Sequence, residues 1–350
     1  MEPLNWLVFG AGAIGTYIGG SLALHKRKEQ SVVFLERPEI AAQVRLHNLR
    51  LRLDGEEHLL PDPRITGSLS EALAVGPFDI AVLALKSYDT KAFLDGLGEQ
   101  ADLLPPILCL QNGVENEPLL AATLGEQRVI AGTVTSAVGR LGPGDIILER
   151  RRGIGIARGH PLSERIYAEF IPVGLNPRLY DRALDMKWSK MLTNLLANAT
   201  SAILNLTPAQ IFAHPGLYNL ERQQLREALR VMKKLGIRVV SLPGTPVRLL
   251  AFAVKTLPAP VARPLLQRAV GKGRGEKMPS FHIDLYNGRK QSEVDYLNGA
   301  VVRFGAQVGV PTPVNRLLNE TLLSLARGEL PLKAYALQPE KLLERLPPYR

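Results

Sequence analysis

Residues 4–15, LNWLVFGAGAIG, join a short apolar run directly to a glycine turn. The run at residues 4–9 predicts a buried β-strand, and the apolar residues after the turn predict a helix. In such a strand–turn–helix unit, Gly10 permits the tight turn, Gly12 lets a pyrophosphate approach the backbone, and Gly15 lets the helix pack closely. Because a helix N-terminus attracts phosphate, the turn predicts a dinucleotide site whose cofactor-binding residues are Gly10, Ala11, Gly12, Ala13, Ile14 and Gly15.

A second apolar run, residues 31–35 (SVVFL), follows the glycine turn and ends at Glu36 and Arg37. In a dinucleotide-binding fold this strand end contacts the adenosine ribose. Glu36 is the acid expected to bind a free 2'-hydroxyl, as in NAD, whereas Arg37 is the cation expected to bind the 2'-phosphate of NADP. These two neighbours alone leave the choice of cofactor open.

Two further apolar runs, residues 79–85 and 107–110, predict buried parallel strands. Lys86 follows the first run, and Asn112 lies just after the second. Since ligands bind outside the carboxyl ends of parallel strands, we expect both side chains at the sheet edge that carries the glycine turn. The alternatives are a surface lysine and an ordinary Asn-Gly turn. More strands, some of them antiparallel, are predicted at residues 129–138, 145–148 and 153–157, with a turn at 142–144.

After Pro177 the pattern is helical only. The sequence therefore predicts an α/β fold in two domains: an N-terminal Rossmann-type doubly wound sheet over residues 1–178, and an all-helical C-terminal domain over residues 179–350.

One predicted helix of the second domain, residues 188–205 (WSKMLTNLLANATSAILN), combines an apolar circumference with a narrow polar stripe. At about 100° per residue the stripe spans about 80°. Because the rest of the helix is apolar, we expect the stripe to face a cleft or a polar network, with a solvated face as the alternative. A lysine beside two carboxamides suits an anionic, carbonyl-bearing ligand. The stripe consists of Lys190, Asn194, Asn198, Ser201 and Asn205.

The composition is that of a globular protein, with 46% hydrophobic and 22% charged residues. Lys and Arg exceed the acids by 43 to 33, but the charges are scattered and no RNA-binding signature is present, so nucleic acid is not an expected partner. The single cysteine, Cys109, excludes an internal disulfide. No apolar run reaches the roughly 18 residues of a membrane span, and no signal-peptide pattern is present. We expect a cytoplasmic protein with no membrane association.

With these residues in place, the chain resembles the ketopantoate reductase (2-dehydropantoate 2-reductase) family over nearly its whole length. The resemblance implies an N-terminal domain that binds NADPH, a helical domain that closes over a 2-oxo acid substrate, and a place in pantothenate and coenzyme A biosynthesis. The motifs that carry it are residues 10–15, Lys86, residues 110–113 (LQNG), residues 188–190 (WSK) with Asn194 and Asn198, and residues 292–299 (SEVDYLNG).

By this resemblance Lys190 is the general acid of the reaction, and Arg37 selects NADPH. Lys86 and Asn112 lie where nicotinamide and substrate meet. The chemistry is reasonable in itself, because hydride attack on a 2-oxo group builds negative charge that a nearby ammonium stabilises and protonates. No metal is required. The substrate-binding residues that the resemblance implies are Asn194, Asn198, Ser280, Glu293 and Asn112.

The sequence departs from the family pattern in two places. The proline-rich segment 243–277, which ends in a basic loop at 271–277, is longer than the usual connection. It suits a lid near an anionic ligand or an ordinary surface excursion. The spacing from Ser280 to Glu293 is one residue longer than expected. Glu293 also has a structural interpretation, because Ser292 and Asp295 can form a capping box that places it in a first helical turn.

Three functions remain in competition. The first is NADPH-dependent reduction of 2-dehydropantoate to pantoate. The second keeps the chemistry but changes the substrate to another 2-oxo acid or to an opine-like condensation product. The third is a dinucleotide-binding regulator without catalysis. The sequence does not decide the oligomeric state, and a homodimer is the candidate assembly.

Overall fold

The computed structural model describes residues 2–26, 29–258, 263–264 and 277–346, and the chain forms two compact units. Unit 1 extends past residue 178 because Met186 and Lys187, in the first turns of helix α7 (Ala183–Leu195), are buried in it. The boundary expected at residue 178 stays a prediction of where a separable domain ends. Unit 1 comprises Met1–Gln111, Glu115–Lys187 and Leu242–Thr245, and unit 2 comprises Asn112–Val114, Trp188–Ser241 and Pro246–Arg350.

Within its described residues, unit 1 contains an eight-stranded sheet with the strand order β12-β11-β8-β7-β6-β1-β2-β5. The predicted apolar runs form its centre: β1 (Trp6–Phe9), β2 (Val32–Leu35), β6 (Ile80–Leu83) and β7 (Ile107–Cys109). The other strands are β5 (Ile65–Thr66), β8 (Val129–Val134), β11 (Ile154–Ala157) and β12 (Pro177–Tyr180).

The central strands are parallel, and the last residues of neighbouring strands pair with one another. Phe9 pairs with Leu35 on one side and with Leu83 on the other, and Leu83 pairs with Cys109. The carboxyl ends of β1, β2, β6 and β7 therefore share one edge of the sheet, as the sequence predicted. β11 runs antiparallel to β8, which confirms the expectation of mixed strand directions.

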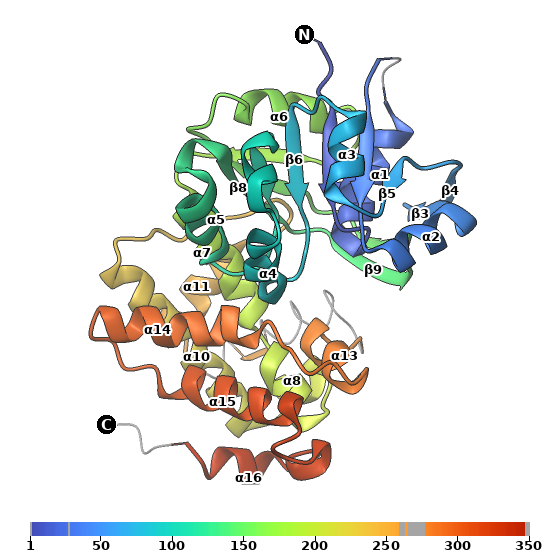
Figure 1. Cartoon of the computed structure of the whole chain (residues 1–350). Helices are drawn as coiled ribbons and strands as arrows, with labels where there is room; N and C mark the ends of the chain where they lie inside the picture. The colour runs from blue at the N-terminus through green and yellow to red at the C-terminus, as the bar shows by residue number, and fades with distance from the viewer. Residues whose placement is uncertain (1, 27–28, 259–262, 265–276, 347–350) are drawn as a thin grey trace. The chain divides into compact units, whose positions relative to one another are not determined.

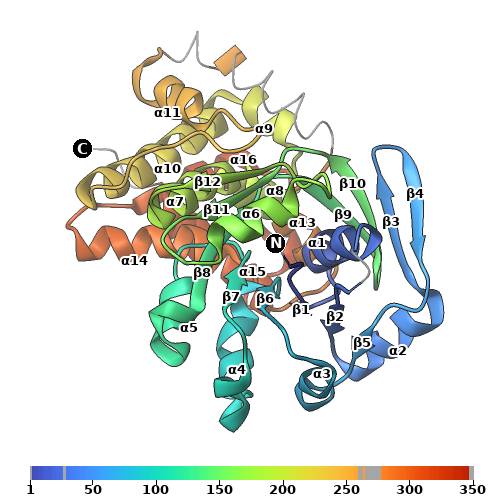
Figure 2. The same cartoon turned by 90° about the horizontal axis from the view of Figure 1, so that it is seen from above.

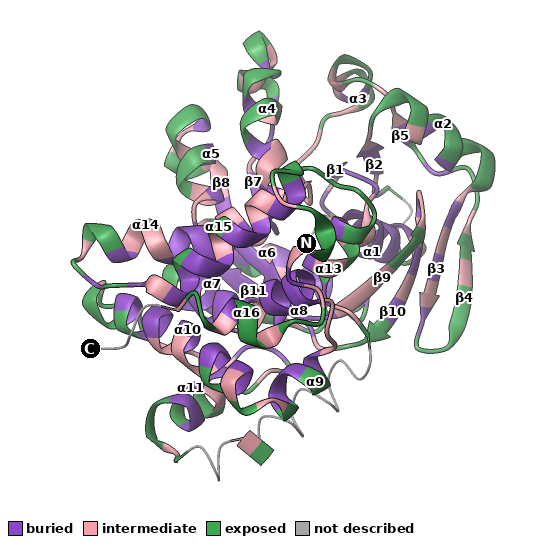
Figure 3. Cartoon of the chain, turned by 90° about the horizontal axis from the view of Figure 1, so that it is seen from below, coloured by how far each residue is buried: buried purple, intermediate pink, exposed green. Residues whose placement is uncertain are grey.

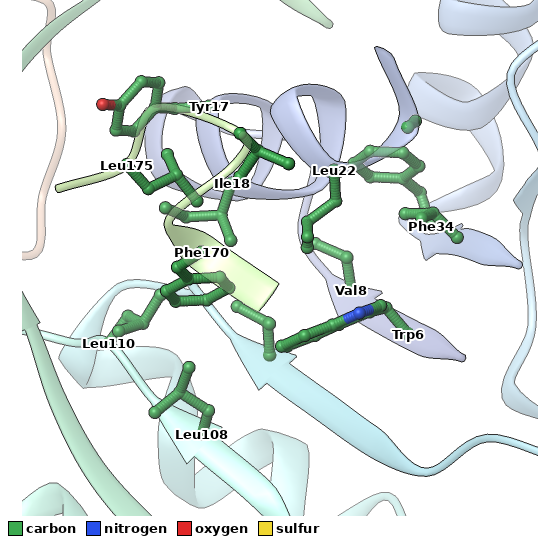
Figure 4. Close-up of a cluster of buried hydrophobic side chains, with 14 of the residues drawn as sticks. Trp6, Val8, Tyr17, Ile18, Leu22, Phe34, Leu108, Leu110, Phe170 and Leu175 are labelled. Carbon is green, nitrogen blue, oxygen red and sulfur yellow. The ribbon is translucent and has the colours of Figure 1, made fainter. Parts of the chain in front are cut away.

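Helices cover both faces of this sheet, so the fold is doubly wound (Figures 1 and 2). Side chains alternate along β1: Trp6 and Val8 enter one core, and Leu7 and Phe9 enter the other. In the first core Trp6 stacks on Phe170 with 5.4 Å between ring centroids (Figure 4). The unit 1 helices are α1 (Ala13–Leu24), α2 (Pro38–His47), α3 (Leu69–Val75), α4 (Thr90–Asp95), α5 (Asn116–Leu124) and α6 (Ser163–Phe170), with 3-10 turns η1 (Ser87–Asp89), η2 (Gly98–Leu103) and η3 (Glu126–Arg128).

A second sheet of unit 1, with the order β4-β3-β10-β9, packs on α1. Leu49 and Leu51 of β3 and Ile146 of β10 join the core on the α1 side of the large sheet. The predicted strand 129–138 is thus two strands, because the chain leaves β8 and turns into this second sheet. The turn at 142–144 is confirmed. The strands are β3 (Leu49–Leu53), β4 (Glu56–Leu60), β9 (Ala137–Gly142) and β10 (Asp145–Arg150).

The regular elements among the described residues of unit 2 are all helices, as predicted. The expectation of helices only after Pro177 was wrong for residues 177–180, because these form strand β12, which pairs with β11 in unit 1. α8 is buried along its whole length (Figure 3). Thr207 caps α9 through a capping box with Gln210. Besides the second part of α7, its elements are α8 (Asn198–Leu204), α9 (Pro208–Ala213), α10 (Pro215–Lys234), α11 (Val247–Thr256), α13 (Ser280–Tyr286), the π-helical η4 (Asp295–Gly299), α14 (Ala300–Gln307), α15 (Pro313–Arg327), η5 (Leu332–Ala334) and α16 (Pro339–Leu343).

The prediction of one continuous helix over residues 188–205 was wrong. α7 ends at Leu195 and α8 begins at Asn198, because Ala197 adopts a left-handed conformation with φ of 53°. The N–H of Ala197 donates instead to Glu221 Oε2, at 2.7 Å. A carboxylate on a separate helix, α10, thus replaces the next helical hydrogen bond and fixes the break between Asn194 and Asn198.

Glu221 should accordingly contribute strongly to stability. Its buried carboxylate also accepts hydrogen bonds from the Thr200 hydroxyl and from Gln224 Nε2. Glu221→Met leaves these buried donors without their acceptor, so we expect the free energy of unfolding to fall by about 3 kcal/mol or more. The control Glu320→Met, at an exposed position of α15, should stay within about 0.5 kcal/mol. Urea unfolding of both variants tests this, and equal losses would contradict the role of Glu221.

Two expectations from the sequence, the absence of a membrane span and a basic loop after the proline-rich segment, can be compared with the described residues only. Among the described residues, none of the helices combines the length and apolarity needed to cross a bilayer. The proline-rich segment is described at residues 243–258, 263–264 and 277, where it forms α11. The basic loop predicted at 271–277 lies, apart from Lys277, outside the described residues.

Candidate active site

The glycine turn joins β1 to α1 in unit 1 and has the geometry that a pyrophosphate site needs. Gly10 has φ of +96°, a conformation that favours glycine. A Cβ at Gly15 would lie 1.8 Å from the Gly10 carbonyl oxygen, so only glycine fits there. A Cβ at Gly12, by contrast, would meet no atom within 4 Å. The turn thus leaves open space at the N-terminus of a twelve-residue helix that no side chain caps.

Glu36 and Arg37 at the end of β2 differ in what they contact. Glu36 Oε2 accepts a hydrogen bond from Ala11 N at 2.9 Å, and its Oε1 accepts one from Arg37 N at 3.0 Å. The Arg37 side chain is 77% exposed, and its Nε lies 3.8 Å from Glu36 Oε1. The Glu36 carboxylate is therefore bonded to main-chain amides of the glycine turn and of its own neighbour, while the Arg37 guanidinium extends toward solvent.

A buried hydrogen-bond network holds the ends of β6 and β7. Gln111 Nε2 donates to the main-chain oxygens of Leu85 and Lys86, at 3.1 and 3.2 Å, and to Thr90 Oγ1 at 2.9 Å. Thr90 Oγ1 in turn donates to Asn116 Oδ1 at 2.9 Å. The main chain at Lys86 is therefore fixed beside the strand end that precedes Asn112. Lys86 itself is half-buried at the N-terminus of η1.

In unit 2, the structure brings Asn112 into contact with Asn194 of the predicted polar stripe. Asn194 Nδ2 donates to Asn112 Oδ1 at 2.9 Å. Lys190 precedes Asn194 by four residues on α7, so the two side chains share one face of the helix. Both are half-buried. A cation and two carboxamides thus lie on the same part of unit 2, although 78 residues separate Asn112 from Lys190 in the sequence.

Asn198, which begins α8, connects the stripe to α13. Its Oδ1 accepts a hydrogen bond from Phe281 N at 3.1 Å, and its side chain is 4% exposed. This places Asn198 at the N-terminus of the helix whose first residue is the exposed Ser280. The last stripe residue, Asn205, lies close to His282, with 2.7 Å between Oδ1 and Nε2. Burial lowers the pKa of His282, which favours the neutral ring.

Glu293 is buried, at 3% exposure, just before η4. The capping box predicted for its neighbours does not form. The Ser292 hydroxyl accepts from Val294 N at 3.2 Å, and Asp295 Oδ1 binds Arg303 Nη1 at 3.0 Å. Asp295 thus pairs with Arg303 of α14, and Ser292 bonds the amide of Val294 instead of the amide of Asp295. The capping interpretation of Glu293 is wrong, and its buried position has to be explained otherwise.

The sequence analysis missed a buried ion pair in unit 1. Lys187 Nζ lies 2.6 Å from Glu117 Oε1 and donates hydrogen bonds to the main-chain oxygens of Gln111, at 2.7 Å, and Gly132, at 3.2 Å. Burial by itself would lower the pKa of Lys187, but the neighbouring Glu117 carboxylate outweighs it and raises the pKa. Lys187 therefore carries its charge in the protein interior. The sequence feature that could have indicated this pair is a charged residue between the apolar Met186 and Trp188.

Known proteins resemble this chain over most of its length. The sequence profile of "Ketopantoate reductase PanE/ApbA" matches residues 6–159, and that of "Ketopantoate reductase PanE/ApbA C terminal" matches residues 182–326. A 2-dehydropantoate 2-reductase from Mesorhizobium japonicum is 30% identical over 333 residues, which cover 87% of this chain and 93% of the relative. One from Pyrococcus horikoshii is 26% identical over 319 residues, covering 89% and 94%.

Solved structures show the same fold. A PanE/ApbA family ketopantoate reductase from Ralstonia eutropha JMP134 superposes with a TM-score of 0.76 and 26% identity, covering 93% of this chain and 99% of the other. A D-mandelate dehydrogenase, solved with NADH and anilino(oxo)acetate, superposes with a TM-score of 0.74 and 21% identity over 92% and 98%. The second likeness is one of fold alone. On the profile matches and the 30% identity over most of its length, the chain belongs to the ketopantoate reductase family.

Proposed function

We propose that this protein reduces 2-dehydropantoate to pantoate with NADPH. The observation that supports this most is the hydrogen bond between Asn194 and Asn112, one helical turn from Lys190. A cation and two carboxamides at one place in unit 2 suit a ligand that has a carboxylate and a carbonyl oxygen. The names of the curated relatives supply the substrate, and the glycine turn of unit 1 suits a dinucleotide.

In this proposal Lys190 is the general acid. Hydride transfer to the 2-oxo carbon breaks the C=O π bond, so negative charge builds on the carbonyl oxygen in the transition state and would be complete in the alkoxide. The Lys190 ammonium stabilises this charge and then donates its proton, which gives the 2-hydroxy acid. A positive group is suited to both steps, since it attracts the oxygen before the proton moves.

The remaining polar residues are proposed to bind and orient the substrate. Asn194 and Asn112, which are bonded to each other, are the two carboxamides proposed to bind the 2-oxo acid. Asn198 uses its Oδ1 on Phe281 N, which leaves its Nδ2 as the donor for substrate. The exposed hydroxyl of Ser280 is the proposed carboxylate donor, and Glu293 is the proposed acceptor for the substrate hydroxyl.

The residues of the glycine turn would hold the cofactor pyrophosphate. The open space at Gly12 and the uncapped N-terminus of α1 fit such a group. NADPH, when bound, supplies the hydride. Lys86 and Asn112 are the proposed neighbours of its nicotinamide end, since each follows the carboxyl end of a central strand.

A substrate panel tests the proposal. The purified protein is given NADPH with 2-dehydropantoate and with unbranched, smaller and aromatic 2-oxo acids, and kcat/KM is measured for each. The highest value is expected for 2-dehydropantoate. A higher kcat/KM for another 2-oxo acid would identify that acid as the better substrate. If no acid of the panel supports NADPH oxidation, a non-catalytic regulator would be favoured.

Cofactor preference gives a separate prediction. Glu36 is occupied by Ala11 N and Arg37 N, whereas the Arg37 guanidinium extends toward solvent, where it can bind a 2'-phosphate. Wild-type protein should therefore prefer NADPH to NADH. Arg37→Ala should lower kcat/KM for NADPH by about tenfold or more, because a charged hydrogen bond contributes roughly 1.5–3 kcal/mol.

The same substitution should leave kcat/KM for NADH nearly unchanged, since NADH has no 2'-phosphate. Arg316→Ala, at an exposed position of α15, is the matched control and should change neither value. Steady-state kinetics with both cofactors decide the matter. A wild-type preference for NADH, or equal losses with both cofactors in Arg37→Ala, would remove Arg37 from cofactor selection.

A further inference from the structure

Two of the contacts of the buried Lys187 are with unit 1 residues that adjoin unit 2 segments in the sequence, and a third is with the Gly132 carbonyl in β8. Gln111, whose carbonyl it binds, is the last residue of unit 1 before Asn112, and Lys187 itself is the last before Trp188. Glu117, its ion-pair partner, follows the return of the chain to unit 1 by two residues. One ammonium group therefore holds both segments that lead to the proposed substrate residues.

The hydrogen bond to Gln111 fixes a peptide plane that also contains the amide of Asn112. The Gln111 C=O and the Asn112 N–H belong to one planar group, so holding the oxygen sets the direction in which the chain enters Asn112. The Gln111 side chain is already held by Leu85, Lys86 and Thr90. The Lys187 ammonium opposes rotation of the Gln111–Asn112 peptide, because rotation would break its hydrogen bond to the Gln111 oxygen.

A charged group here is not explained by stability alone. A buried ion pair can often be replaced by apolar residues without loss of stability, whereas removing one partner leaves the other charge uncompensated. Glu117 Oε1 is buried with Lys187 Nζ at 2.6 Å, and the buried thiol of Cys109 also interacts with the Glu117 side chain. The pair therefore keeps Lys187 charged and places its protons on the two main-chain oxygens.

From these contacts we infer that Lys187, held by Glu117, is a positioning residue for the reaction: it orients the Gln111–Asn112 peptide and the start of the helix segment that carries Lys190. The inference rests on the proposed function for its effect on rate. It predicts that loss of Lys187 impairs turnover of the 2-oxo acid much more than cofactor binding, because the glycine turn that would hold the pyrophosphate is not among the contacts of Lys187 in the described part of the chain.

The test compares Lys187→Met with the double variant Lys187→Met/Glu117→Met. The single variant leaves an uncompensated carboxylate and should unfold at a lower temperature than the wild type. The double variant removes that charge, so it should unfold at a higher temperature than the single variant, but it still lacks the donor to Gln111 O. Its kcat should remain at least tenfold below wild type, with the Kd for NADPH within twofold.

Hydrogen–deuterium exchange gives a readout that does not depend on activity. In the double variant, exchange in a peptide spanning residues 110–118 should be at least tenfold faster than in the wild type. Lys91→Met is the matched control, because Lys91 pairs with Asp95 at 2.7 Å on the surface of α4. It should change neither kcat nor exchange in this peptide.

Recovery of kcat to within threefold of wild type in the double variant would show that Lys187 acts only through stability, and would overturn the inference. Unchanged exchange at residues 110–118 would overturn it as well. If the wild type reduces no 2-oxo acid, the proposed function fails, and the exchange measurement still decides whether Lys187 positions the peptide.

Discussion

Replacing Lys190 with alanine is expected to lower kcat for 2-dehydropantoate by about 100-fold or more, the contribution typical of a positioned general acid. The Kd for NADPH should stay nearly unchanged, because the glycine turn that would hold the pyrophosphate belongs to unit 1 and Lys190 belongs to unit 2. KM for the 2-oxo acid can also rise, since the same ammonium attracts the carboxylate. Steady-state kinetics, with NADPH affinity measured by fluorescence titration, check this.

A merely solvated lysine would behave differently. Lys91→Ala, at a side chain that is 75% exposed, is the control and should leave kcat unchanged and stability within about 0.5 kcal/mol. If Lys190→Ala resembles this control, Lys190 is not the acid. Lys86 would then be the next candidate, because it follows the carboxyl end of β6.

Gly12→Ala is expected to weaken NADPH binding strongly while leaving the fold intact. The added methyl group meets no protein atom within 4 Å, and φ at Gly12 is −77°, which alanine adopts freely. Its stability should therefore fall by less than about 1 kcal/mol, the scale of an N-cap change. The methyl group would occupy the space proposed for the pyrophosphate, and overpacking of this kind costs about 1–3 kcal/mol. The Kd for NADPH should accordingly rise about tenfold or more.

Substitutions at two other glycines are the controls for this experiment. Gly142→Ala adds the same methyl group at the end of β9, where the nearest atom is 3.9 Å away, and should leave the Kd unchanged. Gly15→Ala, in contrast, places a Cβ 1.8 Å from the Gly10 oxygen and should disrupt both the turn and binding. An unchanged Kd in Gly12→Ala would mean that the pyrophosphate does not lie at this turn.

The parts of the fold that depend on local pattern could be predicted from the sequence. Buried apolar runs marked β1, β2, β6 and β7, and the glycine spacing marked the turn after β1. The hairpin β3–β4 was missed, although Asp54-Gly55 directly after the alternating Leu and Arg residues 49–53 is a known hairpin signal. The local sequence therefore contained enough information to predict this hairpin.

The helix break at Ala197 could not have been predicted in this way. Alanine has the highest intrinsic helix propensity, and the apolar pattern continues through the break. The cause is Glu221, 24 residues away on α10, whose carboxylate binds the N–H of Ala197. The Lys187–Glu117 pair is similar, since its partners are 70 residues apart. Tertiary contacts of this kind override local propensity and leave little trace in a single sequence.

The most direct test of the proposed function is the product formed by the wild-type protein. Purified protein is incubated with 2-dehydropantoate and a limiting amount of NADPH, and pantoate is quantified by mass spectrometry against the NADPH oxidised. We expect one pantoate for each NADPH, and no NADPH oxidation when the 2-oxo acid is left out. NADPH oxidation without pantoate, or no oxidation in the presence of 2-dehydropantoate, would contradict the assignment.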